Sequence, residues 1–352
     1  MFNPVWRKPF TGIWKVEAKI NSVWLLIPGV LLLSMLLTWV VVRYALHKNM
    51  LDIPNQRSSH DEPTPRGGGL AIVLTFLGAI LILFLLNGIP KPLFWALFGG
   101  GVLVSGVGFL DDHRDVPARW RFSVHIIAAV WAVFWLRESP LGVVDWIGDM
   151  LLVASITWLL NLFNFMDGID GLTVGEAIFV SFAVGLLLLE SGFGGASFRL
   201  FLLATACGGF ACWNWPPAKI FMGDVGSGFL GYILGVFILE SAGFGQQYLY
   251  VWLILLGVFL VDATFTLVRR ILTNQNWVQA HRSHAYQHAA TFLKSHKKVT
   301  LSVLTINFLW LFPLSACVLI WPDTAPLLLL SAYFPLIWIV VILQAGMKFS
   351  RF

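Results

Sequence analysis

Charged residues are scarce in this chain, and their scarcity excludes a soluble globular protein. Asp, Glu, Lys and Arg make up 12% of the 352 residues, whereas soluble domains carry roughly 25%. Hydrophobic residues make up 58%, and the mean hydropathy is +0.80. The 17 Trp and 29 Phe suit membrane interfaces and lipid-facing helices. We therefore predict an all-α polytopic membrane protein.

Cysteine is rarer still, and the three that occur do not suggest a disulfide framework. Cys207 and Cys212 lie five residues apart in one apolar run, so on a helix they point in different directions. Cys317 is alone.

Long apolar runs are abundant instead. They measure about 17–22 residues, the length that a helix needs to cross a bilayer. We expect about eleven transmembrane helices, at 22–42, 69–88, 93–110, 122–136, 148–164, 173–190, 198–213, 227–242, 248–268, 299–321 and 325–346. They form a single transmembrane domain over 22–346. A tail over 1–21 that suits an interfacial helix precedes it, and a short tail over 347–352 follows.

Lys and Arg gather on one side of this arrangement. The segments after the odd-numbered runs hold most of them, and they are 43–68, 111–121, 165–172, 214–226 and 269–298. The segments on the other side hold only Lys91, Arg137 and Arg199. Because positive loops stay in the cytoplasm, these polar segments are expected to be cytoplasmic. The basic N-terminal tail disagrees, but the loops outweigh it.

Two adjacent carboxylates follow the third apolar run. Asp111 and Asp112 are neighbours, and Asp115 lies one helical turn beyond Asp111. Their mutual repulsion is relieved by a divalent cation or by a shared proton. The alternative is a solvated loop whose acids pair with Arg114 and Arg119.

The sequence NLFNFMDGIDGL carries a regular polar pattern. Asn164, Asp167 and Asp170 recur at every third residue, so on a helix they spread over one arc. Their oxygens suit Mg²⁺ or the edge of a sugar or base, and Gly168 and Gly171 allow a ligand close to the backbone. The alternative, a helix end with a capping Asp and Gly, explains only part of this set.

A third polar segment precedes the eighth run. Asp224 lies between Gly223 and Gly226, with Ser227 following. Small residues with free N–H groups at a helix start favour an anion, and an Asp among them can hold the metal that accompanies it. A simple N-cap is the alternative reading.

Histidines mark the segment HRSHAYQH. His281, His284 and His288 share a face if the segment is helical, with Arg282 alongside. A zinc site, a phosphate-binding cluster and a basic interfacial helix are the three readings. Phosphate binding is favoured because neither Cys nor an HExxH pattern accompanies the histidines.

Two lesser features remain. PTPRGGG, which contains Arg66, suits either a backbone-donor turn beside a phosphate or a hinge. Asp262 lies inside an apolar run, which makes it a functional candidate unless it pairs with Arg269 or Arg270. Acids, histidines and arginines at one cytoplasmic face suit Mg²⁺ and a diphosphate, with a substrate anchored in the membrane.

These motifs resemble the polyprenyl-phosphate N-acetylhexosamine-1-phosphate transferases over most of residues 22–320. The resemblance comprises PTPRGGG, the Asp111–Asp112 pair, NxxNxxDGxDGL, FMGDxGS, the spacing from Asp262 to Arg269-Arg270, and the His-rich loop. NxxNxxDGxDGL together with FMGDxGS is highly specific. The loop HRSHAYQH differs from the HxH-type loop of the peptidoglycan and common-antigen enzymes and looks more like that of the O-antigen-initiating branch.

The resemblance implies a reaction in the bacterial inner membrane, with the active site on its cytoplasmic loops. UDP-N-acetylhexosamine and undecaprenyl phosphate would give undecaprenyl-diphosphate-sugar and UMP, which initiates O-antigen or another cell-surface polysaccharide. Mg²⁺ is the implied cofactor, with Mn²⁺ as a substitute. Membrane lipids are expected partners and nucleic acid is not, and a homodimer stays open. The donor sugar and a one-step or covalent-intermediate route stay open as well.

The resemblance also assigns roles to residues. Asp224 and Asp167 are the implied Mg²⁺ ligands. The catalytic candidates are Asp111, Asp112 and Asp170, with Asp112 as the candidate base. The substrate-binding candidates are Asn164, Asp167, Asn214, Phe221, Asp262, His281, Arg282, His284 and Arg66. The rival reading as a transporter is disfavoured, because transporters place charges along a path at mid-membrane. A non-catalytic binding homologue is a further alternative, although no motif acid is missing.

Overall fold

The computed structural model describes residues 24–54, 62–136, 145–276 and 281–347. Its helices are α2 (Leu26–His47), α3 (Gly69–Leu85), α4 (Lys91–Arg114), α5 (Ala118–Leu136), α6 (Asp145–Met166), α7 (Leu172–Glu190), α8 (Gly194–Asn214), α9 (Asp224–Ala242), α10 (Gln246–Leu255), α11 (Gly257–Leu272), α12 (Ala285–Leu293), α13 (His296–Ile306), α14 (Phe312–Ile320) and α15 (Ala325–Ile342). The tail predicted over 1–21 and nearly all of the predicted C-terminal tail lie outside the described residues.

The prediction of an all-α polytopic membrane protein is confirmed. Eight described helices are long and apolar enough to cross a membrane, or nine if α10 and α11 form one bent span. Each of the eleven predicted runs lies on a helix, but the count of eleven spans is not confirmed. The helix α3 has 17 residues, and α5 is not among the eight. Arg119, Arg121 and His125 lower the hydropathy of the first half of α5.

Two of the predicted runs are interrupted. The run expected over 248–268 bends by 73° between α10 and α11. The run expected over 299–321 contains a π-helical turn, Asn307–Leu311, between α13 and α14. Pro313 follows that turn, and because proline lacks the N–H that an α-helix needs, it favours this irregular stretch.

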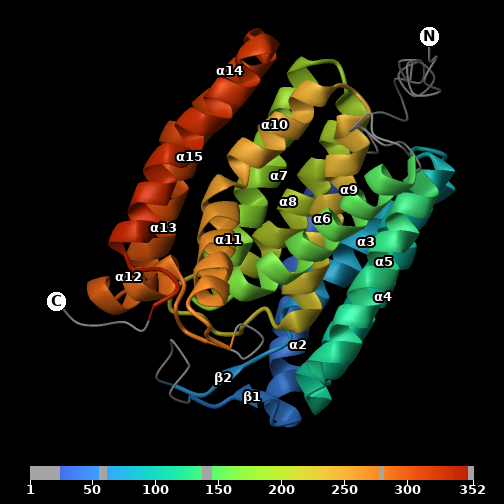
Figure 1. The fold of residues 1–352 in the computed structure, drawn as a ribbon. Helices are drawn as coiled ribbons and strands as arrows, with labels where there is room; N and C mark the ends of the chain where they lie inside the picture. The colour runs from blue at the N-terminus through green and yellow to red at the C-terminus, as the bar shows by residue number, and fades with distance from the viewer. Residues whose placement is uncertain (1–23, 55–61, 137–144, 277–280, 348–352) are drawn as a thin grey trace.

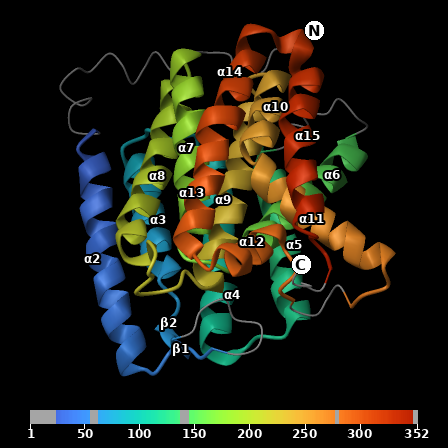
Figure 2. The same cartoon turned by 90° about the vertical axis from the view of Figure 1, so that its left-hand side faces the viewer.

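The helix α9 forms the centre of the bundle and is buried along nearly its whole length. It packs against α3, α4 and α6, while α13–α15 form one edge and α4 and α5 the opposite edge (Figure 1). A view turned by 90° shows α2 beside α8 at the periphery (Figure 2). The peripheral α2 and α15 expose many large apolar side chains, as helices in contact with lipid do.

Glycines allow α9 to approach its neighbours closely. A Cβ atom added at Gly231 would lie 2.6 Å from the carbonyl oxygen of Leu159 on α6. A Cβ added at Gly69 of α3 would lie 2.3 Å from the Cα of Gly226. Both contacts are with backbone, which cannot rotate away. The described sheet is the antiparallel pair β1 (Leu51–Asp52) and β2 (Thr64–Pro65).

We expect Gly231→Ala to destabilise the protein in detergent by about 1–3 kcal/mol, because the added methyl group forces α6 and α9 apart. The measurement is the thermal unfolding temperature of the purified protein. Gly106→Ala on α4 is the matched control, since a Cβ there meets nothing within 4 Å. Equal unfolding temperatures for the two variants would contradict the close packing of α6 on α9.

Candidate active site

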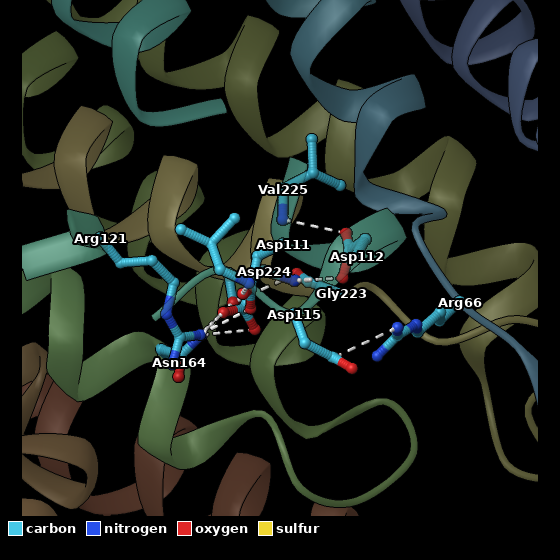
Figure 3. Close-up of polar contacts among 11 residues, drawn as sticks. Arg66, Asp111, Asp112, Asp115, Arg121, Asn164, Gly223, Asp224 and Val225 are labelled. Carbon is cyan, nitrogen blue, oxygen red and sulfur yellow. Dashed lines mark hydrogen bonds and ion pairs between the residues drawn. The ribbon is translucent and has the colours of Figure 1, made fainter. Parts of the chain in front are cut away.

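The N-terminus of α9 is held by a carboxylate from another helix. Asp112, near the end of α4, is only 4% exposed. Its Oδ1 accepts the backbone N–H of Asp224 at 3.1 Å, and its Oδ2 accepts that of Val225 at 3.2 Å (Figure 3). The first N–H groups of a helix have no partner within the helix, and they attract negative charge. Asp112 therefore caps α9 and fixes the backbone of Asp224.

Two glycines make room for this cap. Gly223 has a φ of +76°, and a Cβ there would lie 2.5 Å from Asp112 Oδ2. A Cβ at Gly108 of α4 would lie 2.5 Å from the carbonyl oxygen of Asp224. Glycine is therefore required at position 223 of the FMGDxGS motif, because any side chain there would displace the capping carboxylate of Asp112.

The side chains of Asp111 and Asp224 converge on one cationic nitrogen. Arg121 Nη1 donates to Asp111 Oδ2 at 2.7 Å and also forms an ion pair with Asp224 Oδ2. Asn164 Nδ2 donates to Asp224 Oδ1 at 2.9 Å and to Ser227 Oγ at 3.2 Å. The ends of α4, α5, α6 and α9 therefore meet at this cluster (Figure 3).

This set of oxygen donors fits Mg²⁺. Two carboxylates from different helices already share a positive group, so their oxygens point toward a common position. Within the described ranges, no three His, Cys, Asp or Glu side chains come together as a metal site. Mg²⁺ is typically held by one or two carboxylates together with water and substrate phosphates. Asp224, a predicted ligand, and Asp111 could hold it in this way, whereas the other predicted ligand, Asp167, lies in the turn after α6.

The polar arc expected for Asn164, Asp167 and Asp170 does not form, because α6 ends at Met166. Asp167 and Asp170 lie in the turn between α6 and α7. Asp170 Oδ2 accepts the N–H of Ala218 at 3.1 Å, and its Oδ1 lies 3.2 Å from His296 Nδ1 at the start of α13. Of the three predicted residues, Asn164 contacts Asp224, whereas Asp170 joins this turn to two other segments.

Asp167 lies in the turn between Asn164 and Asp170, where the charges of Asp224 and Asp170 both act on its carboxyl group. Burial raises the pKa of its carboxyl to about 7, and the negative charges of Asp224 and Asp170 add to this effect. Burial penalises the charged form, so the folded protein binds a proton here more tightly than the unfolded chain does.

The His-rich loop does not form one helical face, because α12 begins only at Ala285. His284 precedes α12, and its Nδ1 lies 3.2 Å from Asp262 Oδ1. Asp262 also accepts the N–H groups of Ala285 and Tyr286, at 2.9 and 3.0 Å. Asp262 therefore caps α12 as Asp112 caps α9. It does not pair with the arginines that follow it on α11.

The loop nevertheless lies beside the turn that carries Asp167. Tyr286 Oη donates to the carbonyl oxygen of Phe165 at 3.0 Å, and a Cβ added at Gly168 would lie 2.2 Å from that hydroxyl. Burial, with the nearby charges of His284 and Arg270, lowers the pKa of His281 to about 3. Its imidazole is therefore neutral at pH 7. Arg282 donates to Thr291 Oγ1 at 3.2 Å.

The remaining predicted residues, Asn214, Phe221 and Arg66, form contacts at the same end of the bundle. Asn214 is buried; its Oδ1 accepts the N–H of Gly171 at 3.0 Å and its Nδ2 donates to the carbonyl oxygen of Ile220 at 2.9 Å. The N–H of Phe221 donates to the carbonyl oxygen of Pro65 at 2.8 Å. Arg66 Nη2 lies 3.8 Å from Asp115 Oδ1. PTPRGGG and FMGD are therefore hydrogen-bonded neighbours through their backbones.

A groove of about 1080 Å³ leads from this cluster along α5 and α6. Its polar end includes Arg121, Asn164 and Asp224. Its remaining length is mainly apolar, with side chains that include Ile126, Val130, Phe134, Val153 and Trp158. The site residues predicted from the sequence did not include Arg121. An arginine at the start of an apolar run could have been recognised, because a charged side chain there needs a partner of opposite charge.

The chain is similar in sequence to known proteins over most of its length. Residues 94–242, which run from α4 to α9, match the model of Glycosyl transferase family 4. The chain is 31% identical over 307 residues to a Bacillus subtilis protein named "Probable undecaprenyl-phosphate N-acetylglucosaminyl 1-phosphate transferase", covering 82% of each chain. The chain belongs to the polyprenyl-phosphate N-acetylhexosamine-1-phosphate transferases.

Two further relatives are similar to this transferase. The undecaprenyl-phosphate alpha-N-acetylglucosaminyl 1-phosphate transferase of Thermotoga maritima is 30% identical over 264 residues, 72% of this chain and 78% of the relative. The decaprenyl-phosphate N-acetylglucosaminephosphotransferase of Mycolicibacterium smegmatis is 29% identical over 309 residues, 77% of this chain and 75% of the relative.

In this transferase, Asp112→Asn is expected to lower stability by about 1–3 kcal/mol and to reduce activity, because an amide NH₂ would face a backbone N–H that now has an acceptor. The checks are the unfolding temperature in detergent and the rate of nucleotide release. Asp115→Asn is the matched control, since the Asp115 side chain is 94% exposed. An unchanged unfolding temperature for Asp112→Asn would show that the cap does not stabilise α9.

The raised pKa of Asp167 predicts a pH dependence of stability. Between about pH 4 and pH 7 the unfolded chain loses this proton while the folded transferase keeps it, so stability falls as the pH rises through this window. Asp167→Asn should reduce the slope of that dependence in unfolding measured without metal or substrate. Asp323→Asn, whose aspartate is exposed, should keep the wild-type slope. A slope in Asp167→Asn equal to that of the wild type would contradict the assignment.

Proposed function

We propose that this protein transfers N-acetylhexosamine-1-phosphate from a UDP-sugar to undecaprenyl phosphate, producing undecaprenyl-diphosphate-sugar and UMP. One observation carries the proposal. The cluster of Asp111, Asp224 and Arg121 lies at the mouth of an apolar groove between α5 and α6. A phosphate-handling cluster that continues into an apolar groove suits a substrate with a phosphate at one end and a hydrocarbon chain at the other.

The groove has the dimensions of a prenyl-chain site. From Arg121 to Phe134, α5 advances by about 20 Å at 1.5 Å per residue, roughly two thirds of the hydrocarbon thickness of a bilayer. The apolar residues of the groove would replace lipid around the first isoprene units. The phosphate end would then lie beside Arg121.

The diphosphate of the donor would approach the same cluster from the loops. Mg²⁺, or Mn²⁺ in its place, would be held by Asp224 and Asp111, and it would neutralise charge on the phosphates when bound. The turn with Asp167 and the loop with His281 and His284 lie at the same end of the bundle and would hold the nucleotide and sugar. Asp170 and Asn214 would shape this region through their backbone contacts.

The chain's own residues would mainly reduce charge repulsion. An oxygen of the acceptor phosphate attacks the β-phosphorus of the donor, and the bond from that phosphorus to the UMP oxygen breaks, with its electron pair leaving on UMP. The second pKa of a phosphate monoester is about 6, so the acceptor is mostly dianionic at pH 7 and needs no general base. Arg121 would screen the approach of this dianion.

In this proposal Asp112 does not act as the general base, the role that the resemblance implied. Both of its oxygens accept N–H groups of α9, so it acts as a positioning residue for Asp224. The basic loops support a cytoplasmic site at the bacterial inner membrane. The relatives named for N-acetylglucosamine favour UDP-N-acetylglucosamine as the donor. The product would begin O-antigen or another cell-surface polysaccharide.

The test is nucleotide release by the purified protein with undecaprenyl phosphate, Mg²⁺ and a panel of UDP-N-acetylhexosamines. We expect UMP to be released only when the lipid is present, and Asp224→Asn to slow release on the order of 10²–10³-fold. Asp323→Asn, at an exposed position after α14, should keep the wild-type rate. Release of UDP would instead indicate ordinary glycosyl transfer and overturn the mechanism.

A further inference from the structure

The groove contains further polar side chains, one to two helical turns deeper than the carboxylate cluster. His125 follows Arg121 by four residues on α5, and Asn161 and Thr157 precede Asn164 by three and seven residues on α6. At 1.5 Å per residue, His125 and Asn161 lie about 5–6 Å farther from the loops than the cluster does, and Thr157 lies about 10 Å farther. His125, Thr157 and Asn161 all line the groove, and we call them the polar neck.

Two atoms of the polar neck are buried without a hydrogen-bond partner. They are His125 Nδ1 and Thr157 Oγ1. The Asn161 amide is already engaged, because its Nδ2 donates to the carbonyl oxygen of Thr157 at 2.7 Å and its side chain also hydrogen-bonds with the His125 imidazole. Buried polar atoms normally have a partner, because leaving one unpaired costs free energy. Two unpaired atoms in one groove therefore indicate a polar ligand.

The His125 imidazole lies among three helices. Its Nε2 lies toward α9, where Gly228 stands one turn after Asp224, and a Cβ added at Gly228 would lie 3.9 Å from that nitrogen. The imidazole therefore extends between α5, α6 and α9, directly below the carboxylates. Above it lies Arg121, and below it the groove lining is apolar apart from Thr157 and Asp149.

We propose that the polar neck binds the phosphate group of the polyprenyl acceptor, with His125 donating its Nδ1–H and Thr157 its hydroxyl to phosphate oxygens. This inference rests on the proposed function. The prenyl chain has no hydrogen-bonding atoms, so the phosphate is the polar group that an acceptor lying in this groove brings to the neck. A phosphate dianion only accepts hydrogen bonds, which requires the imidazole tautomer that carries hydrogen on Nδ1.

The consequence is a defined orientation of the acceptor. The phosphate lies beside His125, with Arg121 above it and Thr157 below it, the prenyl chain continues down the groove, and one phosphate oxygen faces the side of Asp224. His125 and Thr157 are then substrate-binding residues that select a phosphate over an alcohol of the same chain length. The UDP-sugar, which enters from the loops, does not contact them.

The test separates the two substrates kinetically. We expect His125→Ala to raise the KM for undecaprenyl phosphate at least about tenfold, a loss of one charge-assisted hydrogen bond, with the KM for the UDP-sugar unchanged. His125→Gln, which keeps an N–H donor, should recover most of this loss. Thr157→Val should raise the same KM and Thr157→Ser should not. Ser123→Ala is the control, because Ser123 is exposed and bonds within α5.

A binding measurement makes the test independent of turnover. Undecaprenyl phosphate should raise the unfolding temperature of the wild type more than undecaprenol does, and His125→Ala should remove most of that difference. A wild-type KM and a wild-type temperature difference in both His125→Ala and Thr157→Val would overturn the polar neck. If His125→Ala does not fold, Thr157→Val, which keeps the side-chain shape, decides the outcome.

The failure of this inference is distinguishable from failure of the proposed function. A wild-type protein that releases no UMP with any donor would count against phosphosugar transfer, while the temperature difference would still test phosphate binding at the neck. A wild type that releases UMP, with neck variants that behave as the wild type does, would leave the function intact and refute the neck.

Discussion

The hydrogen bonds from the first turn of α9 to Asp112 are the interaction on which the site depends. The helix α9 lies at the centre of the bundle, and α3, α4 and α6 pack against it. Asp112 joins the start of α9 to the end of α4, so the backbone of Asp224 has one position relative to Asp111. Because the carboxylate meets N–H groups at the positive end of a helix, the cost of burying its charge is partly offset.

Asp262 uses the same physical solution on the other side of the site. Its oxygens accept two N–H groups at the start of α12 and contact His284, which holds the His-rich loop next to α11. The four aspartates around the site therefore have two different roles. Asp112 and Asp262 hold helix starts in place, whereas Asp111 and Asp224 present their carboxylates to Arg121. The aspartates that hold helix starts in place are therefore different residues from those that bind the Arg121 cation, even for the adjacent pair Asp111 and Asp112.

The sequence predicts the helices well because bilayer thickness and hydropathy set their length, and every predicted run is helical, although the runs over 248–268 and 299–321 are interrupted. It also locates the motifs that meet at one end. It does not show that Asp170 turns toward Ala218 and α13, or that Asp262 caps α12, because these contacts depend on where Met166 and Ala285 begin or end helices. The partner of Asp112 lies 112 residues away, and its approach depends on glycines whose role is visible only once α4 and α9 are packed.

The least apolar of the predicted spans illustrates how the fold and the chemistry are linked. Arg121 and His125 reduce the hydropathy of α5, and on a lipid-facing surface they would be costly. The structure turns both toward α6 and α9, where Arg121 pairs with carboxylates and His125 lines the groove. The apolar residues of the same helix continue the groove below them. The feature that makes α5 a weak span by composition is therefore the one that gives the groove between α5 and α6 a polar end.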